Sequence, residues 1–147
     1  MAGSSVTVTT SNAVGLGGDK EIIINLSCVS DDTNGTVPDQ DLGDTEGYGG
    51  LIYYYLDEVI TTPGSSPPTT QYRVYIADAD GAQLFLSSSD RSLSDKELEA
   101  AYSGSTTGNY PRIDGTVTVR VAATGAITQA DIGNSKDLEI ELRLYRK

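Results

Sequence analysis

The stretch that most restricts the fold of this chain is Asp137–Tyr145, which reads DLEIELRLY. Its apolar residues occupy every second position, and mostly charged residues stand between them. Successive side chains of a strand point to opposite faces, so a strand would separate the two kinds, whereas a helix would mix them. The stretch therefore predicts a half-buried antiparallel strand. The face expected to be buried carries Leu138, Ile140, Leu142 and Leu144.

The same period of two recurs along the chain, with turn-forming residues between the runs. Asp80-Gly81 suits a tight hairpin, because glycine accepts a positive φ. The sequence predicts an all-β fold, a single-domain antiparallel β-sandwich or flattened barrel that covers residues 1–147. Further strands are expected at Ser5–Thr9, Lys20–Cys28, Leu51–Ile60, Gln71–Ala77, Ala82–Leu86 and Thr116–Ala122.

Two segments between the predicted strands have a different character. Ser94–Glu97 matches the S-x-x-E capping box and precedes LEAAY, so one short α-helix is expected at about 95–102. Residues 30–50 are acidic and poor in apolar side chains, and they predict a long exposed loop, with Thr36-Val37 as a candidate short strand.

The residue inventory argues against catalysis. The chain has no histidine and a single cysteine, Cys28, which excludes the common triads and the usual zinc sites. The glycine-rich segment Gly15–Lys20 lacks the Gly-Lys-Ser/Thr ending of a phosphate-binding loop. We expect no enzyme activity, no catalytic residue and no cofactor. Cys28 continues the apolar series of its predicted strand, which favours a small core residue over a reactive thiol.

Calcium is an alternative to weigh, because acidic residues stand near glycine turns at Asp31–Gly35 and Asp78–Gly81. Neither segment fits the spacing of the EF-hand loop, nor does the acidic stretch Asp39–Glu46. Turn chemistry and a solvated loop explain them more simply, and no metal site is expected.

The charge is strongly negative and uneven. The formal net charge is −11, and residues 1–70 contain ten acidic residues against one basic residue, Lys20. Such a chain is repelled by phosphate backbones and anionic lipids, so neither nucleic acid nor a membrane is expected as a partner. The N-terminal residues lack the features of a signal peptide, which favours synthesis in the cytoplasm without secretion by that route.

Tyrosine and arginine recur at positions expected to face outward. If Tyr54 points inward, its neighbours in the triplet Tyr53-Tyr54-Tyr55 point outward. Cross-strand packing within the sheet is one explanation. A protein–protein contact face is another, because both residue types are enriched at interfaces. A sugar-binding platform is a third, although such sites favour tryptophan, which is absent. The candidate contact residues are Tyr53, Tyr55, Arg73, Tyr75, Arg143 and Tyr145.

The second part of the chain, roughly residues 48–147, contains a series of short motifs. They are Pro63-Gly64, Pro68–Val74, Asp78–Gly81, Asp90–Ser92, Thr116–Val119 and Leu144–Arg146. This series resembles a pattern of small structural proteins of tailed bacteriophages. The pattern is a Pro-Gly loop, a P-T-x-x-Y-x-V strand, an Asp-x-Asp-Gly hairpin, a short apolar strand, an Asn/Asp-Arg-Ser segment, a Thr-Val-x-Val strand and a final L-Y-R.

The resemblance implies a β-rich virion protein without enzyme activity, present in many copies. The expected role is capsid decoration, that is, a cement protein on the outer surface of a phage head. Its partners would be the major capsid protein or other virion proteins, and a homo-oligomer such as a trimer is expected. The alternatives are a tail or head–tail connector component and a carbohydrate- or receptor-binding module.

Overall fold

The computed structural model describes residues 4–14, 20–43, 54–101, 110–113 and 115–146. Within them the chain forms nine strands and no helix. The strands are β1 (Ser5–Val14), β2 (Lys20–Val29), β3 (Gln40–Leu42), β4 (Tyr55–Pro63), β5 (Arg73–Asp78), β6 (Gln83–Leu86), β7 (Glu97–Ala100), β8 (Val117–Ala122) and β9 (Asp137–Arg146).

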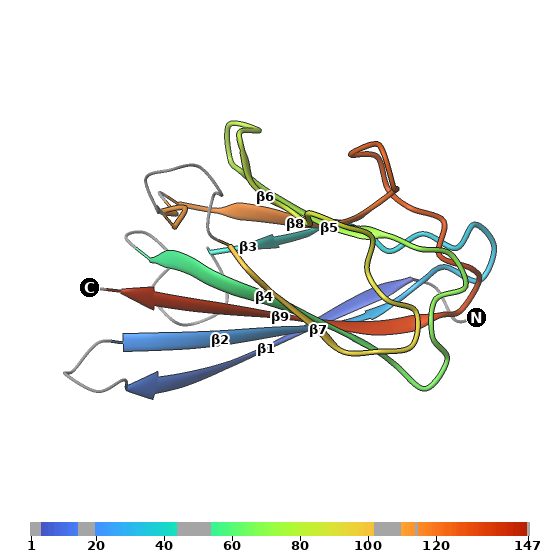
Figure 1. The fold of residues 1–147 in the computed structure, drawn as a ribbon, viewed down its shortest axis with the longest axis horizontal. Coiled ribbons are helices and arrows are strands. Elements are labelled where there is room, and N and C mark those ends of the chain that lie inside the picture. The colour runs from blue at the N-terminus through green and yellow to red at the C-terminus, as the bar shows by residue number, and fades with distance from the viewer. Residues whose placement is uncertain (1–3, 15–19, 44–53, 102–109, 114, 147) are drawn as a thin grey trace.

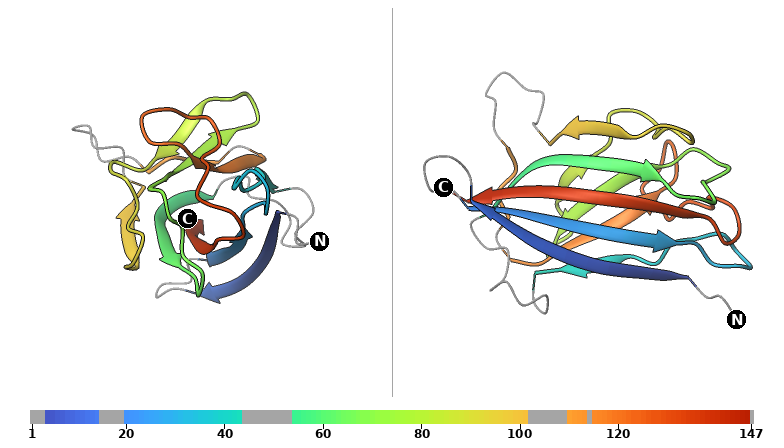
Figure 2. Two further views of the ribbon diagram at one scale, coloured as in Figure 1. Left: turned by 90° about the vertical axis from the view of Figure 1, so that its right-hand side faces the viewer. Right: turned by 90° about the horizontal axis from the view of Figure 1, so that it is seen from below.

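The strands form two antiparallel sheets that pack face to face (Figure 1). The order in the five-stranded sheet A is β1-β2-β9-β4-β7, and the order in the four-stranded sheet B is β3-β8-β5-β6. The two views of Figure 2 show sheet A as a broad twisted layer with β1 at one margin and β7 at the other. The predicted all-β sandwich is therefore confirmed.

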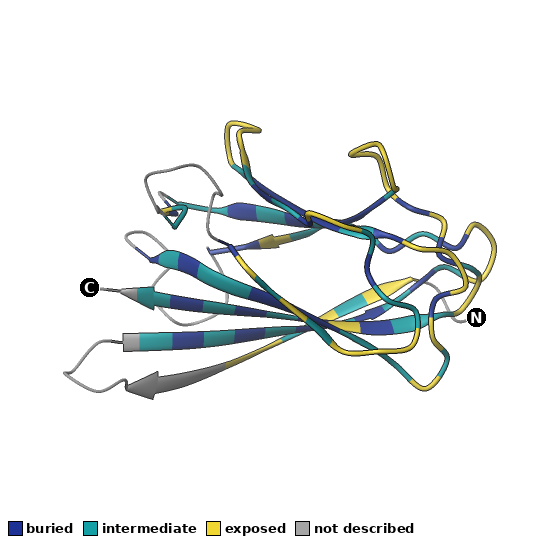
Figure 3. Ribbon diagram, in the orientation of Figure 1, coloured by how far each residue is buried: buried dark blue, intermediate teal, exposed yellow. Residues whose placement is uncertain are grey.

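The strand with the clearest alternation, β9, lies in the middle of sheet A. It pairs with β2 on one side and with β4 on the other. The alternating colours of Figure 3 follow its two faces: the four apolar side chains predicted to be buried are each at most 1% exposed, and the residues between them are partly or fully exposed. The inner face of β2 continues this layer with Ile24, Leu26 and Cys28, so Cys28 is a core residue as expected.

Sheet B supplies the other half of the core. Val74 and Ile76 of β5 and Val119 and Val121 of β8 point toward sheet A and are buried. Burial of such side chains contributes about 1.5–3 kcal/mol each, so this shared apolar layer is the main stabilising feature of the sandwich. The residues that alternate with them on the two strands point away from sheet A and form the outer face of sheet B.

The helix predicted over about 95–102 is wrong where the structure describes it. Glu97–Ala100 forms strand β7, which pairs with β4 at the edge of sheet A, and Tyr102 lies outside the described residues. Glu97 does not complete a capping box. Its carboxylate accepts a hydrogen bond from the Ser92 backbone N–H at 2.8 Å and pairs with the buried Arg91 guanidinium at 3.2 Å. Tertiary pairing has outweighed local helix propensity here.

The long exposed loop predicted over 30–50 is correct only in part: residues 30–39 form no strand and Asp32–Asn34 are exposed, but the segment also contributes to the core. Val37 and Leu42 are 1% exposed, and Gln40–Leu42 forms the strand β3 beside β8. The side chains of Val37 and Leu42 join the core, while the acidic side chains of Asp39 and Asp41 stay at least partly exposed. Thr36-Val37 is not a strand, and residues 44–50 lie outside the described residues.

Candidate partner-binding face

Three tyrosines form a cluster on the outer face of sheet A, where β4 begins and β9 ends. The rings of Tyr55 and Tyr145 stack with their centroids 5.4 Å apart and an interplanar angle of 18°. The ring of Tyr110 meets Tyr145 edge-on at 6.0 Å. All three side chains are only partly buried. We call Tyr55, Tyr110 and Tyr145 the tyrosine cluster.

Backbone pairing explains why these rings meet. Tyr55 and Tyr145 are direct partners in the β4–β9 ladder, and side chains of direct partners lie on the same face. Tyr110 is carried by a short segment along the opposite side of β4, held by hydrogen bonds from the Leu56 N–H to the Pro111 carbonyl and from the Ile113 N–H to the Tyr54 carbonyl. Residues distant in the sequence thus converge on one patch.

Neighbouring charges act on the cluster. Partial burial is the largest cause that raises the pKa of Tyr145, and the nearby Asp57 carboxylate adds to it. Asp57 lies at a bulge of β4, where the ladder shifts between Leu56 and Glu58. The bulge turns Asp57 toward the tyrosine cluster and sets Glu58 opposite Arg143.

Arg143 lies on the same outer face, one inward-pointing residue away from Tyr145. Its guanidinium pairs with Glu58 at 3.2 Å and with Glu141 at 3.1 Å, and Glu141 is the largest cause of its raised pKa. The side chain remains 37% exposed. Arg143 is therefore fixed by carboxylates of its own chain, and it lies on the same face as the tyrosine cluster.

The other predicted contact residues belong to sheet B and do not share this face. Tyr75 points outward from β5, yet it is only 8% exposed, since Arg120 of β8 lies over its ring at 5.8 Å from the centroid. Arg73, also on β5, pairs with Asp90 at 3.0 Å. Tyr53 lies outside the described residues. Among the described candidates, the structure brings together Tyr55, Arg143 and Tyr145 and separates them from Arg73 and Tyr75.

Arg120 is held firmly over Tyr75. Its guanidinium donates to the Asp39 carboxylate, with a shortest distance of 2.6 Å, and to the Ile127 carbonyl at 2.7 Å. Gln129 donates to the same carboxylate at 3.1 Å. The hydrogen bonds from Arg120 are the largest cause that lowers the pKa of Asp39. We call Asp39, Tyr75 and Arg120 the sheet B clamp.

Neither Tyr110 nor Asp39 was among the predicted site residues. Tyr110 lies in a segment without alternation, and Asp39 in a stretch read as solvated loop. The sequence offers no signal for either contact, because both depend on which strands become neighbours.

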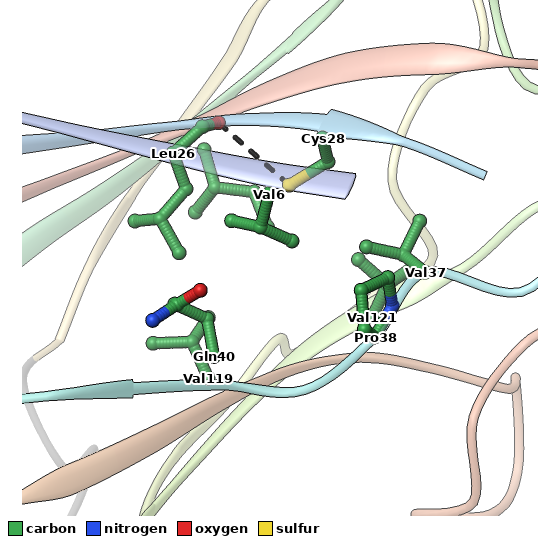
Figure 4. Close-up of a pocket in the computed structure, with 9 residues that line it drawn as sticks. Val6, Leu26, Cys28, Val37, Pro38, Gln40, Val119 and Val121 are labelled. Carbon is green, nitrogen blue, oxygen red and sulfur yellow. Dashed lines mark hydrogen bonds between the residues drawn. The ribbon is translucent and has the colours of Figure 1, made fainter. Parts of the chain in front are cut away.

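A narrow gap lies between the two sheets. Figure 4 shows it lined by Val6, Leu26 and Cys28 from sheet A and by Val37, Gln40 and Val121 from the facing side. It has no room for a water molecule. Burial raises the pKa of the Cys28 thiol to about 12, so the thiol is not ionised near neutral pH and is a poor nucleophile.

In the two acidic turns considered for calcium, one aspartate carboxylate accepts hydrogen bonds from nearby backbone N–H groups. Asp78 Oδ1 accepts hydrogen bonds from the N–H groups of Asp80 and Ala82, and Gly81 adopts a φ of 84° in the predicted hairpin. Asp31 Oδ1 accepts from Thr33 and Asn34 in the same way. Within the described part of the chain, no group of three or more acidic or cysteine side chains is placed to hold a metal ion.

Comparison with protein-family models, with curated proteins and with solved structures finds no match. In the described ranges, no helix has the length and apolarity that crossing a bilayer would need.

Proposed function

We propose that this protein is a virion structural protein of a tailed bacteriophage, a capsid decoration protein that binds the outer surface of the head. The observation that carries the proposal is the tyrosine cluster. It combines three partly exposed aromatic rings with an adjacent arginine on the broad face of sheet A. Tyrosine and arginine dominate the binding energy of many protein interfaces, because they bury a large area and still form hydrogen bonds.

The charge distribution supports an outward location on the particle. The net charge is −11, and the side chains of Arg73, Arg91, Arg120 and Arg143 each pair with a carboxylate of the same chain. The protein therefore carries a large excess of negative charge, which repulsion would disfavour next to packaged DNA. The outer surface of a head imposes no such penalty.

The ring geometry favours protein contact over the alternative of sugar binding. A sugar platform needs an exposed ring face on which the saccharide can stack. Tyr55 and Tyr145 turn their facing surfaces toward each other, and Tyr110 covers a further part of Tyr145. The ring faces that stack on each other are therefore closed to a saccharide, which favours a protein surface as the partner.

The test uses heads of the phage that encodes the chain, purified without this protein and then mixed with it. We expect the wild-type protein to cosediment with them at a copy number that matches the capsid shell. Tyr55→Ser should weaken this binding at least about tenfold, as expected for an interface anchor. Its effect on folding should be small, about 1 kcal/mol or less.

Ile127→Ser is the matched control, since it removes an exposed apolar side chain from the β8–β9 connection, away from sheet A. It should bind like the wild type. Undiminished binding of Tyr55→Ser would reject the tyrosine cluster as the contact. A copy number that fits a single ring would favour the tail or connector alternative, and failure to bind heads would reject the capsid role.

A further inference from the structure

The free edge of β1 has an unusual composition for an exposed strand. β1 pairs with β2 over ten consecutive residue pairs without a bulge, and no other strand of the described residues pairs with its outer edge. Its sequence, SVTVTTSNAV, contains no charged residue and no proline. Folded proteins normally protect a long edge with charges, prolines or bulges, because its unpaired backbone groups attract another strand.

The side of the sandwich beneath β1 is also incompletely covered. At the opposite side, Arg91 is 4% exposed and joins Glu97 and Glu99 of the edge strand β7, with shortest distances of 3.2 and 3.1 Å. At the β1 side, Val6 and Val8 pack against the core but stay only partly buried. Val6 also lines the narrow gap in Figure 4. One side is closed by an ion cluster and the other by two partly buried valines.

The first half of β1 is nearly palindromic in pattern, since Ser5–Thr9 reads SVTVT. When two copies run antiparallel about a two-fold axis at Thr7, Val6 of each copy faces Val8 of the other. In an antiparallel pair, opposite residues share one face of the sheet, so all four valines lie on the core side. The paired threonines and serines lie on the outer side. The segment is thus complementary to itself, as a two-fold interface requires.

We propose that two copies of this chain associate through β1, paired antiparallel about Thr7, so that two sheets A join into one continuous sheet. The partner is a second copy for two reasons. The strand matches itself in pattern, and the segment that would pair, Ser5–Thr9, is uncharged although the whole chain is strongly acidic. The β2 residues opposite Ser5–Thr9 are Val29, Cys28, Ser27, Leu26 and Asn25, which are uncharged as well.

Cysteine cross-linking tests both the contact and its register. Thr7→Cys should form a disulfide-linked dimer under mild oxidation, because residues opposite each other across the axis have Cα atoms about 4.5–5.5 Å apart, within disulfide range. Thr9→Cys is the matched control on the same face. Its partner residue would be Ser5 of the second copy, so the two Cys side chains would stand roughly 13 Å apart and could not bridge. The native Cys28 is buried and should not compete.

Sedimentation provides the second readout. The wild-type protein should show a concentration-dependent dimer that strengthens with added salt, since salt screens the repulsion between two acidic chains. Thr7→Glu would place two carboxylates opposite each other and should weaken dimerisation at least about tenfold. Thr124→Glu adds the same charge to an exposed turn and should leave the dimer unchanged.

The proposal is overturned if the wild-type chain stays monomeric at all concentrations, or if Thr7→Glu does not weaken the dimer. Equal cross-linking of both cysteine variants would overturn the register. Dependence of the oligomer on Tyr55 instead of Thr7 would move the contact to the tyrosine cluster. None of these results depends on binding to a phage head, so the inference and the proposed function can fail separately.

Discussion

The outer faces of both sheets carry tyrosine and arginine, but the tyrosine rings are exposed to different degrees on the two faces. On sheet A, Tyr55 and Tyr145 stack against each other and stay partly exposed beside Arg143. On sheet B, Tyr75 lies beneath Arg120 and is 8% exposed. The difference comes from Asp39 and the Ile127 carbonyl, which hold the Arg120 guanidinium in place.

The comparison shows that an outward tyrosine is not automatically available to a partner. Tyr75 forms a small apolar cluster with Ala77 and Ala122, with Leu86 packed against it, and so stabilises its own sheet. The three rings of the tyrosine cluster on sheet A are only partly buried. Cross-strand packing therefore explains Tyr75, whereas Tyr55 and Tyr145 combine cross-strand packing with an exposed surface.

Tyr75→Ser should destabilise the domain by about 2–4 kcal/mol, because it removes a buried ring and leaves a cavity under Arg120. Urea denaturation measures the change. The matched variant Tyr55→Ser should lose about 1 kcal/mol or less, since its ring is already partly in water. Similar losses of stability in Tyr75→Ser and Tyr55→Ser would contradict the proposed difference between the two outer faces.

Arg120→Ala should cost about 1–2 kcal/mol, because it uncovers Tyr75 and leaves the partly buried Asp39 carboxylate without its main partner. Arg143→Ala is the counterpart on sheet A and should cost about 0–1 kcal/mol, the range of exposed ion pairs. Denaturation of the two variants under one condition gives the comparison. A larger loss for Arg143→Ala would show that the sheet B clamp does not carry the stability assigned to it.

Acid should weaken the sheet B clamp in a predictable direction. Arg120 lowers the pKa of Asp39 below its ordinary value of 3.8, so the unfolded chain binds a proton at Asp39 more readily than the folded chain. This contribution to stability is present above the ordinary pKa and is lost as the pH falls through the lowered one. Asp39→Asn should lower the stability at neutral pH, by about 1 kcal/mol, and show a smaller loss in acid.

Urea denaturation at neutral and acidic pH gives the difference between Asp39→Asn and the wild type. In an Arg120→Ala background the same substitution should have little further effect, because the interaction that lowers the pKa is gone. An unchanged acid dependence in Asp39→Asn would indicate that the clamp contributes nothing through this carboxylate.

Periodicity predicted the sandwich because it reports burial directly. The buried face of β9 follows from alternation and the hairpin at Asp80-Gly81 from glycine chemistry, and the structure confirms both. The helix prediction was wrong because Glu97 and Glu99 form ion pairs with the buried Arg91, and no local sequence pattern indicates this contact. The same limit applies to the acidic segment that becomes β3.

The candidate face was predictable only in part. Alternation can say that Tyr55, Tyr75 and Tyr145 point outward, but it cannot assign strands to sheets. β4 and β9 turned out to be neighbours, while β5 lies in the other sheet. The pairing of distant segments decided which rings meet, and Tyr110 joined them from a segment without a pattern.

The central place of β9 in sheet A has a consequence for how the chain folds. β9 is the last strand in the sequence, yet it separates β2 from β4, so neither of those strands has its full set of neighbours until residues 137–146 arrive. Contacts between segments so distant in the sequence close large loops, which slows folding. During synthesis on the ribosome, the apolar faces of the earlier strands would stay exposed until β9 is made. A chaperone that binds exposed apolar surface would act during this interval.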